Sequence, residues 1–243
     1  MGGPGGRISH RGARESGLLG LERGRALVRE MNRLGVLIDI THGTDAVQTQ
    51  LIEASRAPVV ASHDTLRGVY GFGISDEILK ALAAKGGLVG IHGSAHLVGP
   101  RYRRWMAEKP ENAQHAGGVV GRMVGYLPSA PRAPGDRGEY IARFDEGFRE
   151  RWRDLIAWQE KPEAESLIPT ADEWAAQVDY VIRTVGADHV AIGLDMVGGR
   201  SSVPRTAAGY GEIVAALNRI TTPENVRKVT GENWLRVLGQ ARA

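Results

Sequence analysis

Residues 36–64 read VLIDITHGTDAVQTQLIEASRAPVVASHD, a stretch that contains two short apolar runs, each leading into a histidine. The first run, residues 36–40, leads into His42, and the second, residues 58–62, leads into His63. The segment between the runs has the spacing of apolar residues that is typical of a helix. The stretch therefore predicts a strand, a helix and a second strand, with an imidazole at the end of each strand.

The same alternation of helical and strand patterns continues on both sides of this stretch. Predicted helices cover residues 24–35, 44–55, 75–87, 171–186, 207–220 and 222–238, and further apolar runs cover residues 88–92 and 189–195. In the first helix, the apolar face is predicted to consist of Ala26, Leu27, Met31 and Leu34, and in the third of Ile78, Leu79 and Leu82. Gly35 and Gly186 are placed to end helices, and Ser75, together with Thr44 or Asp45, is placed to cap them. Strands that are almost wholly apolar indicate a parallel sheet covered on both faces, so the predicted fold class is α/β.

Two segments depart from this alternation. The N-terminal residues 1–19 are rich in glycine and predict a flexible tail. Residues 99–170 are rich in proline, glycine and charge, and we interpret them as a long insertion between the third and fourth strands. Such an insertion is either functional, as a lid or an oligomer contact, or a solvated surface excursion. The folded domain is predicted over residues 20–238.

Composition excludes several classes of protein. The chain has 243 residues, 42% of them hydrophobic, which is enough to bury a sizeable core. No segment approaches the roughly 20 apolar residues of a membrane span. A net charge of +3 gives no argument for nucleic-acid binding, and the absence of cysteine excludes disulfides and thiolate metal sites. No signal peptide is recognisable, so the chain as it stands would be cytoplasmic, although its compartment is not assigned.

The strand-end residues have a geometric meaning in a barrel of parallel strands. Side chains at the C-terminal ends of such strands converge on one mouth, where active sites are built. We therefore expect His42, His63, His92 and Asp195 to lie together. Two neutral imidazoles and a carboxylate suit Zn²⁺ or a similar metal with one position left open for water. Such a metal activates water and polarises a carbonyl, which is what amide hydrolysis requires. A single strand-end histidine would more simply be a hydrogen-bonded structural residue.

Several segments together resemble the membrane (renal-type) dipeptidases, peptidase family M19 of the amidohydrolase superfamily. The segments are GRALVREMNRLGVLIDITH, SRAPVVASH, SDEILKALAAKGGLVGI, GADHVAIGLDM and GENWLRVL, and they occur in the same order as in that family. The resemblance implies a (β/α)₈ TIM barrel with a two-zinc site that cleaves dipeptides. It covers residues 20–238 and implies that the chain corresponds to the C-terminal four βα units.

The resemblance also implies roles for individual residues. His42 and His63 would bind one zinc ion, and Asp195 would act as the acid and base that passes a proton to the leaving amine. His92 has no known role in the family, so we expect it to be structural or to face the substrate. Arg67 is the nearest candidate for a substrate-binding arginine.

The chain also lacks parts of the family pattern. No strand supplies the His-x-Asp pair of the first zinc or the bridging glutamate, and Val197 stands where the family usually has a second aspartate. A half barrel would expose two strand edges and a row of apolar side chains, which favours association. The gene would be truncated, or the barrel would be completed by a separate complementing chain or by a second copy in a homodimer.

Three functions remain open from the sequence. The first is a zinc-dependent dipeptidase that is active alone or with a partner chain. The second is a truncated, inactive homologue or an interaction protein, and the missing bridging glutamate supports it. The third is hydrolysis at a single metal of a lactone or an acylated amino acid.

Overall fold

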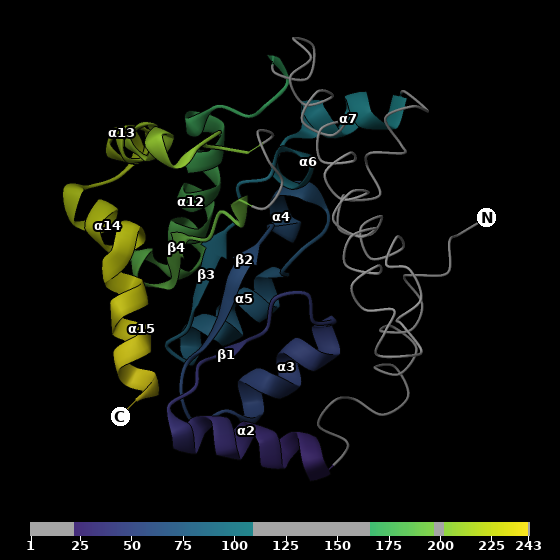
Figure 1. The fold of residues 1–243 in the computed structure, drawn as a ribbon, viewed down its shortest axis with the longest axis vertical. Helices are drawn as coiled ribbons and strands as arrows, with labels where there is room; N and C mark the ends of the chain where they lie inside the picture. The colour runs from purple at the N-terminus through teal and green to yellow at the C-terminus, as the bar shows by residue number, and fades with distance from the viewer. Residues whose placement is uncertain (1–21, 109–165, 197–201, 243) are drawn as a thin grey trace, which may run out of the picture.

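A computed structural model describes residues 22–108, 166–196 and 202–242 of the chain. Their core is a four-stranded sheet in which the strands lie in sequence order, β1-β2-β3-β4, and every neighbouring pair is parallel (Figure 1). The strands are β1 (Ile38–Asp39), β2 (Val59–Asp64), β3 (Leu88–Ile91) and β4 (Val190–Ile192). The predicted tail, residues 1–19, and most of the predicted insertion lie outside the described residues.

Helices connect the strands and continue beyond them. Before β4 they are α2 (Glu22–Leu34), α3 (Asp45–Ala54), α4 (Arg67–Tyr70), α5 (Asp76–Ala84), α6 (Ala95–Val98), α7 (Pro100–Glu108), α12 (Ala171–Val185) and η3 (Ala187–His189). After β4 they are η5 (Ala207–Gly209), α13 (Tyr210–Ile220), α14 (Pro223–Arg227), the π-helical turn η6 (Lys228–Glu232) and α15 (Asn233–Ala241). Parallel strands joined through helices confirm the α/β class. The predicted insertion begins with a helix, α7, in a segment whose composition did not suggest one.

The helix ends follow the sequence signals closely. Thr44 caps α3 and Ser75 caps α5, each through a side-chain oxygen that accepts a backbone N–H of the first turn. Gly35 and Gly186 follow α2 and α12 with φ angles of 67° and 94°, values that glycine adopts without steric cost. The predicted stops and the predicted caps Thr44 and Ser75 are therefore confirmed.

The two faces of the sheet are covered by different helices. Alternate residues of each strand, such as Val59 and Ala61, face a large core built mainly with α5, α12 and α13. The residues between them, Val60, Leu88 and Ala191, form a smaller cluster with Val237 of α15. The face of the sheet that carries Val60, Leu88 and Ala191 is thus partly covered by the chain's own C-terminal helix, contrary to the expected exposed row of apolar side chains. β1 and β4 are the edge strands of the described sheet, as expected.

The predicted apolar face of α2 is wrong. Leu27 and Leu34 are 57% and 59% exposed, whereas Val28, which was not assigned to that face, is only 3% exposed. The helix lies on the β1 side of the sheet (Figure 1), and it faces the core with Val28 and the partly buried Met31. Periodicity identifies which residues share a helix face, but the neighbouring elements decide which face is buried.

Among the helices of the described segments, none is both long enough and apolar enough to span a bilayer.

Candidate functional site

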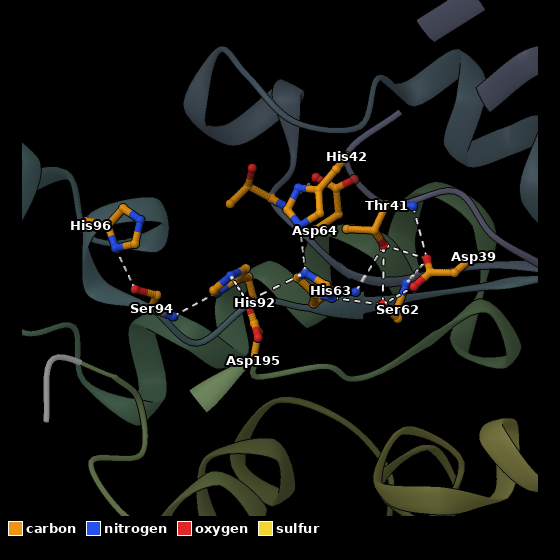
Figure 2. Close-up of polar contacts among 11 residues, drawn as sticks. Asp39, Thr41, His42, Ser62, His63, Asp64, His92, Ser94, His96 and Asp195 are labelled. Atoms are coloured by element: carbon orange, nitrogen blue, oxygen red, sulfur yellow. Dashed lines mark hydrogen bonds and ion pairs between the residues drawn. The ribbon is translucent and has the colours of Figure 1, made fainter. Parts of the chain in front are cut away.

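The four strand-end side chains lie together at the C-terminal edge of the sheet (Figure 2). The Nε2 atoms of His42 and His63 are 3.0 Å apart. The Oδ2 atom of Asp195 lies 3.6 Å from Nε2 of His63 and 3.3 Å from Nε2 of His92. These four residues lie together as predicted. The C-terminal end of each strand therefore contributes one residue to a single site.

Unusual backbone geometry accompanies three of these residues. His42 and Asp195 have φ angles of 65° and 44°, and they are the only described non-glycine residues with positive φ. β2 carries a bulge between Ala61 and Asp64, around His63, where three steps along β2 match two along β3. Bulges redirect side chains, and left-handed residues other than glycine cluster at functional sites. The sheet is therefore distorted where the site lies.

Two glycines allow β2, β3 and β4 to approach closely beneath the site. A Cβ atom added to Gly90 of β3 or to Gly193 after β4 would overlap the carbonyl oxygen of Ser62. The Cβ atom on Gly90 would also lie 2.9 Å from the Cα atom of Gly193. No larger residue fits at either position without moving the strand that carries His63.

A carboxylate and a hydroxyl group determine which nitrogen of His63 carries hydrogen. Ser62 Oγ donates to Asp39 Oδ2, and Thr41 Oγ1 donates to Asp39 Oδ1. Partial desolvation raises the pKa of Asp39, but the hydrogen bonds from Ser62 and Thr41 outweigh it, so the net pKa is lowered and the group is an acceptor. The Ser62 hydroxyl has given its hydrogen to Asp39, so it accepts from Nδ1 of His63, 2.8 Å away. Nε2 of His63 is left as an acceptor, with its lone pair facing Nε2 of His42 at 3.0 Å.

His92 has the opposite hydrogen-bond pattern. The backbone N–H of Ser94 donates to its Nδ1 atom at 2.9 Å, so Nδ1 is the acceptor nitrogen of the ring. The hydrogen of the neutral ring is then on Nε2, the atom that faces Asp195. Burial lowers the pKa of His92 to about 4, although Asp195 opposes this change, and the ring is neutral at pH 7.

A cavity of about 310 Å³ opens beside the histidines. It is lined by His42, His63 and His92, and also by Arg67 and Phe72. The guanidinium of Arg67 makes a bidentate pair with Asp45, with distances of 2.7 and 2.8 Å, and its Nε also donates to the carbonyl of Gly73. Arg67 therefore reaches the cavity, as expected, but it is held by protein groups there. The cavity is large enough for a small polar substrate.

The Nε2 atoms of His42 and His63 fit two of the ligand positions around a zinc ion. Two imidazole nitrogens on one tetrahedral zinc lie roughly 3.3 Å apart, since each zinc–nitrogen bond is about 2.0–2.1 Å long. The spacing of 3.0 Å between the Nε2 atoms of His42 and His63 is close to that value. Within residues 22–108, 166–196 and 202–242, no group of three or more His, Cys, Asp or Glu side chains is arranged to hold a metal ion. The described residues thus offer two ligand positions.

Comparison with known proteins identifies the family. A model described as membrane dipeptidase (peptidase family M19) matches residues 7–243. The chain belongs to peptidase family M19. This confirms the resemblance that the sequence motifs had suggested.

Relatives of the M19 chain match it over different lengths. Dipeptidase 3 of Rattus norvegicus is 44% identical over 68 residues, which are 27% of this chain and 14% of that protein. Dipeptidase tcpJ of Claviceps purpurea is 24% identical over 219 residues, 89% of this chain and 37% of that protein. The M19 chain therefore spans well under half the length of these relatives.

Solved structures show the same fold. A probable dipeptidase, PvdM, from Pseudomonas aeruginosa superposes with a TM-score of 0.61 at 24% identity, covering 90% of this chain and 54% of that one. A metallo peptidase from Rhodobacter sphaeroides, liganded with a phosphinate mimic of the dipeptide L-Ala-D-Ala, has a TM-score of 0.52 at 21% identity, covering 91% and 47%. The M19 chain spans about half of each, which confirms the prediction of part of a TIM-type barrel.

Sequence reasoning missed the residues that support the histidines of the M19 chain, namely Asp39, Ser62 and Ser94. A signal was present for the first two, because each is a polar residue within one of the two apolar runs, residues 36–40 and 58–62. Such a residue has to find a partner when the strand is buried. Ser94 acts through its backbone N–H, which the sequence does not mark.

Proposed function

We propose that the M19 chain is a zinc-dependent dipeptidase-type hydrolase, or the part of one that carries a histidine pair and a proton-transfer acid. The observation that carries this proposal is the facing pair of His42 and His63 Nε2 atoms, 3.0 Å apart and beside Asp195. Zinc, when bound, would activate water and polarise the carbonyl of the substrate.

The residues of the site have distinct roles in this proposal. His42 and His63 hold the metal, and Ser62 and Asp39 keep the free lone pair of His63 directed toward it. Asp195 accepts a proton at Oδ2 and returns it to the leaving amine, since a carboxylate 3.6 Å from the ligand nitrogen is within reach of the reacting groups. Arg67 binds the substrate carboxylate, exchanging its contact with Asp45 for a similar bidentate contact.

The chain spans about half the length of the solved structures on which it superposes, so completion of the barrel is part of the proposal. A separate chain or a second copy of this chain would supply the remaining metal ligands. The alternative is an inactive homologue, and the lack of a third ligand among the described residues favours it.

The deciding experiment measures zinc per chain by elemental analysis after mild dialysis. We expect about one zinc in the wild-type chain and nearly none in His42→Ala. The control is His189→Ala, because His189 bonds to the carbonyl of Gly87 at the other end of the sheet and should not affect zinc content. A folded wild-type chain without zinc would contradict the proposed metal site.

A second measurement follows hydrolysis of a panel of dipeptides by the zinc-loaded chain. We expect activity that is lost in His63→Ala and in Asp195→Asn. Lactones and acylated amino acids in the same panel distinguish a single-metal hydrolase of another specificity. Zinc binding without hydrolysis of any substrate would favour the inactive alternative.

A further inference from the structure

His92 is held more rigidly than the other two histidines of the site. Its side chain is 5% exposed, and its backbone N–H donates to the carbonyl of Asp64 at 3.1 Å. Its own carbonyl accepts the indole N–H of the fully buried Trp174 at 3.1 Å. The main chain on both sides of the ring is therefore fixed by β2 and α12.

The orientation of the ring is fixed by Ser94. The backbone N–H of Ser94 donates to Nδ1 of His92, and a backbone donor cannot be reversed as a hydroxyl group can. The neutral ring therefore carries its hydrogen on Nε2, 3.3 Å from Oδ2 of Asp195. Figure 2 shows this sequence of contacts from Ser94 through His92 to Asp195.

We propose that His92 is a positioning residue that holds the Asp195 carboxylate toward the His42 and His63 pair by donating its Nε2 hydrogen. The inference rests on the proposed function, because it assigns a support to the proton-transfer group of that reaction. Nε2 of His63 has no hydrogen to give, so of the two imidazoles beside Asp195 only His92 is a donor.

The Asp195 carboxylate needs a hydrogen-bond donor to hold it in place, because the backbone of this residue has an unfavourable conformation. Its φ angle of 44° lies in the left-handed region, which costs roughly 1 kcal/mol for most residues other than glycine, although Asp and Asn tolerate it better than the rest. The side chain is 32% exposed and so retains access to water. A hydrogen bond from a buried, rigid imidazole restricts the orientations of the carboxylate and keeps Oδ2 near the metal ligands.

The different tautomers of His63 and His92 also give the two rings different roles, His63 as a metal ligand and His92 as a support for Asp195. The rings of His63 and His92 are neighbours, with centroids 5.6 Å apart. His63 presents a lone pair at Nε2 and is able to bind metal there. His92 presents a hydrogen at Nε2, and its one available lone pair, on Nδ1, accepts the backbone N–H of Ser94, so it has no lone pair for zinc.

The first test is independent of activity and uses long-range ¹H–¹⁵N NMR of the imidazole rings in the whole chain. Without metal, we expect hydrogen on Nε2 of His92 and on Nδ1 of His63. Titration with Zn²⁺ alone should shift the Nε2 signals of His42 and His63, whereas His92 keeps its Nε2 hydrogen. Hydrogen on Nδ1 of His92, or loss of its Nε2 hydrogen when zinc binds, would overturn the proposal.

The second test compares His92→Leu, which removes the donor, with His92→Gln, whose amide places an N–H near the position of Nε2. For the dipeptide-cleaving enzyme we expect kcat to fall about 10- to 100-fold in His92→Leu, with KM and zinc content nearly unchanged, and to recover substantially in His92→Gln. Loss of zinc in a folded His92→Leu chain would make His92 a ligand instead. If the wild-type chain cleaves nothing, the proposed function fails, and the NMR result still decides the role of His92.

Discussion

The hydroxyl group of Ser62 joins the carboxylate of Asp39 to the ring of His63, a proposed metal ligand. It donates to Asp39 and accepts from His63, so one side chain determines the tautomer of the ring. Supporting residues of this kind orient metal ligands and raise their basicity. The support comes from β1 and β2 together, which makes the pairing of these strands part of the site.

Removal of this hydroxyl group should weaken zinc binding. For Ser62→Ala, we expect the dissociation constant of zinc to rise about 10- to 100-fold, because His63 loses the acceptor that holds hydrogen on Nδ1. Isothermal titration calorimetry with Zn²⁺ measures the change. Ser55→Ala is the matched control, since its hydroxyl bonds to Ala57 before β2 begins. Equal affinities in Ser62→Ala and the wild-type chain would show that another contact sets the tautomer.

Arg67 offers a separate prediction about the substrate. Replacement by methionine keeps the length of the side chain but removes the bidentate donor, so KM for a dipeptide should rise about 10-fold or more while kcat changes little. Steady-state kinetics measure both constants. Arg219→Met is the control, because Arg219 pairs with Asp172 on an exposed surface. A fall in kcat at constant KM would instead place Arg67 in the chemical step.

The residues of the site were predictable to different degrees. His42, His63, His92 and Asp195 could be found because each follows an apolar run, and parallel strands bring such positions to one edge. The left-handed backbone of His42 and Asp195 and the bulge in β2 could not be found, since they arise from packing among strands distant in sequence. The engagement of Arg67 by Asp45 depends on how α3 and α4 are placed, which no local pattern specifies.

At the scale of strands and helices, close approach between β2, β3 and β4 requires glycine. We expect Gly90→Ala to lower the free energy of unfolding by about 3 kcal/mol or more, because its Cβ atom would overlap the Ser62 carbonyl oxygen. Chemical denaturation measures the change.

Gly239→Ala in α15 is the matched control for this substitution. A Cβ atom there meets no atom within 4 Å, and alanine is favoured over glycine in a helix, so stability should stay equal or rise by up to about 1 kcal/mol. Equal stability of Gly90→Ala and the wild-type chain would mean that β2 can move aside freely.

Local signals predicted where the elements begin and end better than how they pack. Caps and stops depend on a few neighbouring atoms, so Thr44, Ser75, Gly35 and Gly186 could be assigned from the sequence. The buried face of α2 depends on which elements lie beside it, and periodicity alone assigned Leu27 and Leu34 wrongly.

On the scale of the whole molecule, α15 covers part of the second face of the sheet, so that both faces pack against helices. Val237 packs on Val60, Leu88 and Ala191, on the face of the sheet opposite the large core. Arg236 donates to the carbonyl groups of Gly86 and Asp188, which fixes the helix at the N-terminal ends of β3 and β4. The C-terminal helix therefore buries apolar strand residues on the face of the sheet opposite the large core.

A charge placed on each side of α15 should have very different effects. Val237 is fully buried, so Val237→Asp should lower the free energy of unfolding by about 3–5 kcal/mol through an unpaired buried charge. Leu235 is 72% exposed, so Leu235→Asp should change it by less than about 1 kcal/mol. Thermal and urea denaturation measure both. Similar losses in the two variants would mean that the exposed side of α15 is itself covered in solution.

The order of the strands along the chain also determines which strand contacts form first during folding. β1, β2 and β3 follow one another through short connections, α3 in the first and α4 and α5 in the second, whereas β4 pairs with β3 only after the whole segment 92–189 has been made. Closing a longer loop costs more entropy and delays contact formation, and a chain emerging from the ribosome forms its early elements first. His42 and His63 therefore come together before Asp195 arrives, so a nascent chain that binds zinc as proposed would hold the ion before the proposed proton-transfer residue is in place.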